Sequence, residues 1–326
     1  MIAVVHLVWG PYGAAPLRRF LSSYRQHPAG VEHELIVLFN GVDRSQRDSL
    51  AAELDGVEYR MFELDEPVQD LAAYARAATL LQHERVCFLN SHSVFLVSGW
   101  LLTMAQALDQ SGAGLVGATG SWASVHSAVL NSFLLPNPYR GVVPKRKIAR
   151  VQLLELELER EGMDTSPATV REQSSLGRSI RSTLKGLPGM PRQLLRFEHF
   201  PAHHVRTNAF MLERSLLADL RIGPLRSKVE AYEFESGRHS ITRQVQSRGL
   251  RTLVVARDGA VYDQDRWPLS NTLWQGDQEG LLIADNQTRS YANGGIDRRR
   301  LLSSFAWGAQ AAPRMPAGET SSGDDG

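Results

Sequence analysis

Four polar residues follow a short apolar run early in the sequence. The run 86–89 (VCFL) is succeeded by Asn90, Ser91, His92 and Ser93. Asn90 can offer an amide oxygen and His92 an imidazole nitrogen to a ligand, but neither group carries a negative charge. Because Mg²⁺ and Mn²⁺ prefer anionic oxygen ligands, these residues alone make a poor metal site. They predict a polar strand end whose chemistry depends on what the fold brings beside it.

The elements around this strand end follow a regular order. The first 119 residues alternate between apolar runs of strand length and helical periods. Strands are predicted at 2–9, 33–41, 57–64, 85–90 and 113–119, and helices around 17–24, at 44–54, at 68–84 and at 98–112, where Ser98 opens the helix. This β-α-β-α order predicts an α/β, Rossmann-like fold with a mostly parallel sheet and helices on both faces.

Three polar segments are expected at one edge of that sheet. In open α/β sheets, ligands bind beyond the carboxyl ends of the strands. Residues 9–12, 40–43 and 90–93 all follow predicted strands, and we call them together the polar edge. No G-x-G-x-x-G or Walker-type loop follows any of these strands, which argues against the usual dinucleotide site and against a P-loop NTPase.

The later sequence divides into three parts. Residues 124–200 are predicted to form a basic, Pro-containing helical insertion, 201–300 the second half of the same domain, and 301–326 a tail that is disordered at its end. Residues 140–199 hold 12 Lys or Arg and 7 Asp or Glu. This excess of positive charge indicates either a solvated helical face or a surface for a phosphate-bearing acceptor or a membrane.

Composition sets limits on compartment and partners. The formal net charge of +1 gives no global attraction to nucleic acid, and no basic stripe interleaves with aromatic residues. The single cysteine, Cys87, lies in an apolar run, which predicts a buried thiol and a reducing compartment. The N-terminus has no cationic stretch before its apolar run and is not expected to be a signal peptide. We expect a cytoplasmic protein, with peripheral membrane contact through 140–199 as an open alternative.

Several segments together resemble glycosyltransferase family 2, whose members have the GT-A fold. VVHLVWGPYGAAPLRRFLSSY resembles the opening strand, turn and helix, with Trp9 where the family usually has proline. VCFLNSHSVFLVSGWL is similar to the strand that carries the D-x-D motif and to the helix after it, and VEAYEFESGRHSITRQVQSRGLRTLVV to the acceptor-side helix. The resemblance covers most of residues 1–290. It implies inverting transfer of a sugar from a nucleotide-sugar to an acceptor hydroxyl, with residues 1–123 binding the donor and 201–300 the acceptor.

The transfer that the resemblance implies needs a base for the proton of the acceptor hydroxyl. The acidic pair of the family appears here as Glu235 followed by Ser236, so only its first member is present. Glu235 is the first candidate base and Glu233 the second. The alternative is that one of these carboxylates caps the start of a helix, where the helix dipole favours negative charge.

The departing diphosphate needs positive charge, yet this chain lacks the aspartates of the D-x-D motif. One alternative is a Mg²⁺ or Mn²⁺ site completed by Asp263 and Asp265 in YDQDRW. The other is a metal-independent site in which cationic side chains hold the phosphates. The candidates for that role are His92, Arg206, Arg238 and Arg243.

The nucleoside would be bound by residues at or near the polar edge. Asn40 occupies the position where the family commonly has an aspartate, and its amide could still pair with a base edge. Asp43 and Asp70 are candidates for ribose or base contacts. Trp9 and Tyr12 could stack on a base or a sugar, or could pack the turn.

Two other functions compete with an active glycosyltransferase. The degenerate D-x-D motif favours a glycosyltransferase-like binding module without catalysis. A sugar nucleotidyltransferase would need a Gly-rich loop with Arg or Lys after the first strand, which WGPYGAAPLRRF imitates poorly. For the active enzyme, the resemblance implies a saccharide or lipid-linked acceptor and a role in surface-polysaccharide or glycoconjugate assembly.

Overall fold

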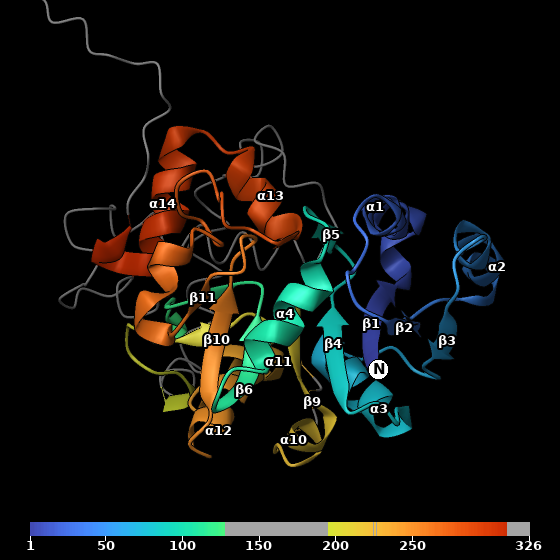
Figure 1. Ribbon diagram of the computed structural model, residues 1–326, viewed down its shortest axis with the longest axis horizontal. Helices are drawn as coiled ribbons and strands as arrows, with labels where there is room; N and C mark the ends of the chain where they lie inside the picture. The colour runs from blue at the N-terminus through green and yellow to red at the C-terminus, as the bar shows by residue number, and fades with distance from the viewer. Residues whose placement is uncertain (128–194, 224, 226, 312–326) are drawn as a thin grey trace, which may run out of the picture.

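The computed structural model describes residues 1–127, 195–223, 225 and 227–311 (Figure 1). Most of the predicted insertion, with its basic surface, and the predicted disordered tail lie outside the described residues. None of the helices in the described part of the chain has the length and hydropathy needed to cross a membrane.

The N-terminal half has the predicted alternation of strands and helices. Its strands are β1 (Ile2–Trp9), β2 (His33–Asn40), β3 (Arg60–Glu63), β4 (Arg85–Leu89), β5 (Val94–Phe95) and β6 (Ala113–Gly117). Its helices are η1 (Gly10–Tyr12), α1 (Ala14–Gln26), α2 (Arg44–Glu53), α3 (Asp70–Leu80) and α4 (Trp100–Leu108). Helix α4 begins two residues after Ser98, because Gly99 adopts a left-handed conformation (φ 76°) and interrupts the helix there.

The main sheet has eight strands in the order β11-β10-β6-β9-β4-β1-β2-β3. The pairs β1–β2, β2–β3, β1–β4 and β6–β10 are parallel, which confirms the predicted mostly parallel sheet. Strand β9 (Ala209–Glu213) runs antiparallel between β4 and β6, and Ala209 lies opposite Leu89. The residues just before β9 therefore arrive at the carboxyl ends of β4 and β6, where the polar edge was predicted.

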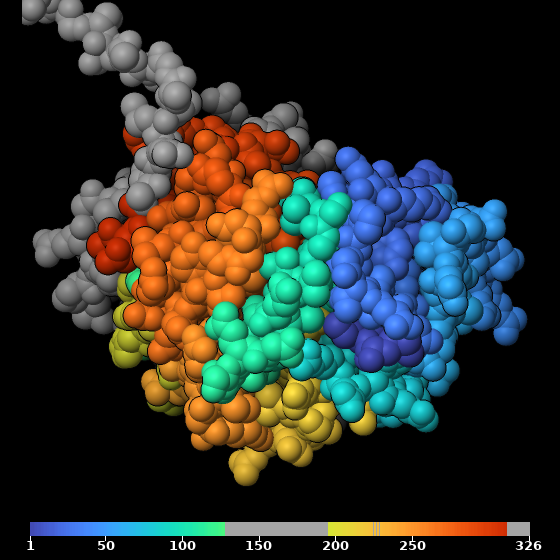
Figure 2. Space-filling view, viewed as in Figure 1, coloured from blue at the N-terminus to red at the C-terminus, as the bar shows by residue number. Residues whose placement is uncertain are grey.

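Helices cover both faces of the sheet. One face buries Val5 and Leu7 of β1 against α3, α10 (Arg214–Ala218), α11 (Lys228–Ser236) and α12 (Ile241–Gln246). The other face buries Val4 and Val8 against α1 and α4. Cys87 is a buried free thiol, as predicted, and burial raises its pKa. Figure 2 shows α4 filling the seam between the N-terminal part, in blue, and the C-terminal part, in orange.

The C-terminal half adds the elements that surround the polar edge. They are β7 (Gly120–Ser121), β8 (His204–Val205), α10 (Arg214–Ala218), α11 (Lys228–Ser236), α12 (Ile241–Gln246), β10 (Arg251–Val255), β11 (Val261–Tyr262), η3 (Gln264–Ser270), β12 (Ile283–Ala284), α13 (Asn286–Ala292), α14 (Ile296–Trp307) and η4 (Gly308–Gln310). Strand β12 pairs antiparallel with β5, so the start of α13 comes close to residues 90–93. Figure 1 shows α13 beyond the arrowheads of β4 and β10.

Strands β7 and β8 form a separate two-stranded ribbon. Gly120 pairs with Val205 and Ser121 with His204. The backbone N–H of Ala202 donates to the carbonyl oxygen of Trp122 at 2.9 Å. Residues 122 and 202, which flank the ribbon, are therefore held next to each other.

Candidate functional site

Residues 90–93 form a compact turn at the end of β4. The Asn90 side-chain Oδ1 accepts hydrogen bonds from the His92 backbone N–H at 3.0 Å and from the Ser93 hydroxyl at 3.1 Å. The Asn90 backbone N–H donates to the Asn208 carbonyl oxygen at 2.9 Å. An amide oxygen has two lone pairs, and both are used inside this turn. Asn90 thus shapes the strand end and has little capacity left to coordinate a metal.

The structure brings the ends of β1 and β4 together, as the sequence predicted. The rings of Tyr12 and His92 lie 4.7 Å apart at an interplanar angle of 42°. The backbone N–H of Trp9 donates to the Ser91 hydroxyl at 3.2 Å. An aromatic ring and an imidazole are therefore adjacent at the polar edge.

The polar residues at the end of β2 make contacts within the protein. The Asn40 side chain is fully buried, its Nδ2 donates to the Val68 carbonyl oxygen at 2.8 Å, and its Oδ1 accepts from the Val68 N–H at 3.0 Å. Asn40 therefore holds a loop, and its amide is not presented to a base. Asp43 caps α2 by accepting from the Gln46 N–H at 2.9 Å, and Asp70 is the exposed first residue of α3.

A buried ion pair lies beside the turn. Nη2 of Arg206 lies 2.9 Å from Oδ2 of Asp285, and these side chains are 10% and 1% exposed. The same Nη2 donates to Oε1 of Gln287 at 2.8 Å. Burial by itself would raise the pKa of Asp285, but Arg206 and the hydrogen bonds from Thr288 outweigh it and hold that pKa below its usual value. The ion pair is thus charged and almost fully buried, and it holds segment 206–208 beside the polar edge.

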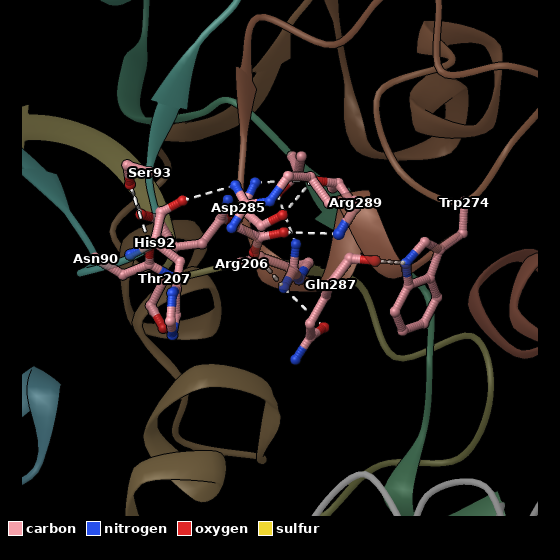
Figure 3. Close-up of polar contacts among 12 residues, drawn as sticks. Asn90, His92, Ser93, Arg206, Thr207, Trp274, Asp285, Gln287 and Arg289 are labelled. Atoms are coloured by element: carbon pink, nitrogen blue, oxygen red, sulfur yellow. Dashed lines mark hydrogen bonds and ion pairs between the residues drawn. The ribbon is translucent and has the colours of Figure 1, made fainter. Parts of the chain in front are cut away.

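Arg289 reaches from α13 to the turn itself. Its Nη1 donates to the carbonyl oxygen of His92 at 3.0 Å (Figure 3). Burial lowers the pKa of Arg289, Asp285 raises it, and Arg19 of α1 lowers it. The guanidinium group therefore lies at the end of β4, within reach of the charges of a second cation and of a carboxylate already engaged by Arg206.

Of the two candidate carboxylates on α11, only one faces the segment before β9. Oε1 of Glu235 accepts the backbone N–H of Thr207 at 3.0 Å. Glu233 instead pairs with Arg196, at 3.0 Å. Because Thr207 lies between Arg206 and Asn208, Glu235 is connected to both the buried ion pair and the turn.

The remaining predicted residues are placed away from this group. Arg243 pairs with Glu198, and Arg238 is exposed, with its backbone N–H bonded to the carbonyl oxygen of Arg196. Asp263 forms a two-point ion pair with Arg251, at 3.0 and 2.8 Å.

The predicted metal ligands therefore do not meet at the polar edge. Strand β11 runs antiparallel to β10, so Asp263 lies toward the amino end of β10, on the side away from the turn. Asp265 is exposed in η3. Across the described residues, no group of three or more His, Cys, Asp or Glu side chains is placed to hold a metal ion.

Asp285 and Arg289 were not predicted from the sequence, although a local signal was present. Asp285 precedes Thr288 by three residues, and each side chain bonds the backbone N–H of the other in a capping box at the start of α13. That spacing is a recognisable helix start. It would have predicted the helix, but not its position beside residues 90–93.

Comparisons with known proteins give matches only among solved structures. No protein-family model matches the chain, and no curated protein matches it. The chain is similar to glucosyl-3-phosphoglycerate synthase from Mycobacterium tuberculosis in complex with Mn²⁺, UDP and phosphoglyceric acid, at 16% identity and a TM-score of 0.37, over 72% of this chain and 62% of that chain.

Two further matches cover less of the chain. A mannosyltransferase from Pyrobaculum calidifontis in complex with GDP-Man and Mn²⁺ matches at 14% identity and a TM-score of 0.30. TarS 1-349 from S. aureus matches at 13% identity and a TM-score of 0.30. In both cases the match covers 36% of this chain and 34% of the other chain.

Proposed function

We propose that this chain is an inverting glycosyltransferase of the GT-A type, which transfers a sugar from a nucleotide-sugar to an acceptor hydroxyl. The observation that carries the proposal is the segment 206–208 before β9. Arg206 pairs with Asp285, the Thr207 N–H binds Glu235, and the Asn208 carbonyl binds the turn at Asn90. A carboxylate, a cationic region and a polar strand end thus meet at the sheet edge where α/β folds bind ligands.

In the proposed reaction, Glu235 accepts the proton of the acceptor hydroxyl. The acceptor oxygen forms a bond to the anomeric carbon on the face opposite the diphosphate. The bond from that carbon to the diphosphate oxygen breaks, and its electron pair leaves with the nucleoside diphosphate. Glu235 suits the role of base because the Thr207 N–H orients its carboxylate at the sheet edge. Tyr12 and His92 offer rings for the nucleoside.

The divalent cation that the family resemblance implies does not fit the residues at this edge. Both lone pairs of the Asn90 amide oxygen are used within its turn. Asp285, which follows the strand that pairs with β5 beside this turn, is 1% exposed and paired with Arg206. Hard divalent cations need several oxygen ligands, usually with negative charge. We therefore assign no step to a metal.

The acceptor is proposed to be a saccharide or a lipid-linked saccharide, with surface-polysaccharide or glycoconjugate assembly as the setting. Support for this part comes from the sequence resemblance alone. The N-terminal half is proposed to bind the donor, because β1 and β4 end there, and Glu235 from the C-terminal half faces the acceptor.

A donor-hydrolysis and transfer assay tests the proposal. UDP-, GDP- and TDP-sugars would be incubated with the protein, with EDTA and with Mn²⁺ in parallel. We expect release of one nucleoside diphosphate, with faster release when a suitable acceptor is added. No turnover of any nucleotide-sugar in either buffer would refute the proposal that this chain is an active glycosyltransferase.

A catalytically inactive binding module is the second candidate. The use of the Asn90 amide within its own turn favours it, because the position of the metal-binding aspartates then has only a structural role. The two candidates differ in one outcome: the binding module would show a nucleotide-dependent rise in melting temperature but no product.

A further inference from the structure

A departing diphosphate carries negative charge that must be stabilised, and no described residue in the turn 90–93 carries a carboxylate that could recruit a metal. Two guanidinium groups lie behind or beside this turn, those of Arg206 and Arg289. Their surroundings differ, and the difference identifies which of them is available to a ligand.

Arg206 is already neutralised. Its Nη2 contacts the carboxylate of Asp285 at 2.9 Å and the amide oxygen of Gln287 at 2.8 Å, and its Nη1 lies 3.4 Å from the Thr119 hydroxyl. The side chain is 10% exposed. A buried ion pair of this kind positions its neighbours, and an incoming phosphate would have to displace Asp285 to reach it.

Arg289 is in the opposite situation. One guanidinium nitrogen donates to the His92 carbonyl oxygen at 3.0 Å, and no carboxylate among the described residues pairs with it. Burial lowers its pKa, Asp285 raises it, and Arg19, itself in no ion pair within the described part of the chain, lowers it. The carboxylate of Asp285 is already paired with Arg206, so it does not form an ion pair with Arg289, and a bound anion would stabilise the partly buried Arg289 guanidinium group.

We propose that Arg289 contacts the diphosphate of the donor and, with Arg19 at longer range, supplies the positive charge that a metal ion supplies in relatives with the D-x-D motif. The assignment rests on the proposed function, because it takes a nucleoside diphosphate as the ligand. The bond to His92 fixes one end of the guanidinium group and leaves the fork of the other nitrogens for phosphate oxygens. Arg289 reaches the end of β4 from the loop and helix that follow β12, whereas the family motif would reach it from β4.

Binding of UDP, GDP and TDP, and of the corresponding nucleosides, would be measured by calorimetry in EDTA and again with Mn²⁺. The proteins are the wild type, Arg289→Gln, Arg289→Lys and Arg257→Ala. Gln keeps a donor for the His92 carbonyl without the charge, and Lys keeps the charge without the fork. Arg257 is the matched control, because it is exposed and likewise donates to one backbone carbonyl, that of Leu96 at 3.1 Å, in the neighbouring strand-end region.

The wild type should bind one nucleoside diphosphate in EDTA. Arg289→Gln should raise its Kd about tenfold or more while the Kd for the nucleoside is unchanged, because a hydrogen bond to a charged group contributes that much. Arg289→Lys should fall between the two, and Arg257→Ala should match the wild type.

Two outcomes overturn the assignment alone: diphosphate binding that requires Mn²⁺, or equal diphosphate affinity for the wild type and Arg289→Gln. A wild type that binds no nucleoside diphosphate in either buffer removes the proposed function itself, and the assignment with it.

Discussion

Replacing His6 should make the protein less sensitive to acid. His6 lies in the middle of β1, is fully buried and stacks on Phe20, with ring centroids 3.6 Å apart. Neither ring nitrogen has a hydrogen-bond partner among the described residues. Burial, with a smaller contribution from His92, lowers the pKa of His6 from 6.5 to about 3. The imidazole is therefore neutral in the folded protein at any pH at which the protein would be assayed.

The sign and size of the effect follow from proton binding. Between the folded pKa of about 3 and the unfolded value of 6.5, the unfolded chain binds a proton at His6 that the folded protein does not bind. Lowering the pH through this window therefore favours unfolding. At about pH 5 the loss of stability from this one residue is about 2 kcal/mol, and it is close to zero at about pH 7.5. The substitution His6→Leu removes this pH-dependent loss of stability.

The assay is urea unfolding of the wild type and His6→Leu at about pH 7.5 and at about pH 5. The stability difference between variant and wild type should shift in favour of the variant by about 2 kcal/mol at the lower pH. His203 and His204, whose pKa values burial lowers to about 4, destabilise both proteins equally and cancel in the comparison. His239→Leu, at an exposed position, is the control and should follow the wild type. Equal pH dependence of the wild type and His6→Leu would refute the reasoning.

Two further predictions concern the site. Glu235→Gln should lower the transfer rate by about 10²- to 10⁴-fold with little change in donor affinity. Glu233→Gln, which breaks only a surface pair with Arg196, should keep most of the activity. Equal loss of activity in both variants would contradict the assignment of Glu235 as the base. Asp285→Asn should lower the free energy of unfolding in urea by about 3–5 kcal/mol, because Arg206 would stay buried without its counter-charge. A loss below about 1 kcal/mol would mean that the pair is solvated.

The local pattern of the sequence was enough to predict the main sheet and one edge of it. Apolar runs and helical periods predicted β1, β2, β3, β4 and β6 but not the short β5, and the rule for carboxyl ends predicted that Tyr12 and His92 lie at the same edge. What local pattern cannot contain is the insertion of β9 between β4 and β6, because these pairings join residues more than ninety positions apart. Segment 206–208 reaches the turn only through that insertion.

The same limit explains the individual residues. Asn40 was expected to face a base, since its type and position suit that role. The loop that carries Val68 takes both of its polar atoms, and nothing near Asn40 in the sequence announces this contact. Arg289 was overlooked for the converse reason: it lies far along the chain from the turn it contacts, and only the pairing of β12 with β5 brings it there.

The β7–β8 ribbon has a consequence for how such a protein can diversify. Residues 122 and 202, which lie next to the paired strands β7 and β8, are held together by a backbone hydrogen bond. The entropic cost of closing a loop grows slowly with its length. A change in the number of residues between the two ends therefore adds little closure cost, and the pairing of β7 with β8 keeps the start of β9 beside β4 and β6. Because segment 206–208 follows β8 directly, the ribbon fixes the position of the residues that reach the polar edge, whatever the length of the chain before β8.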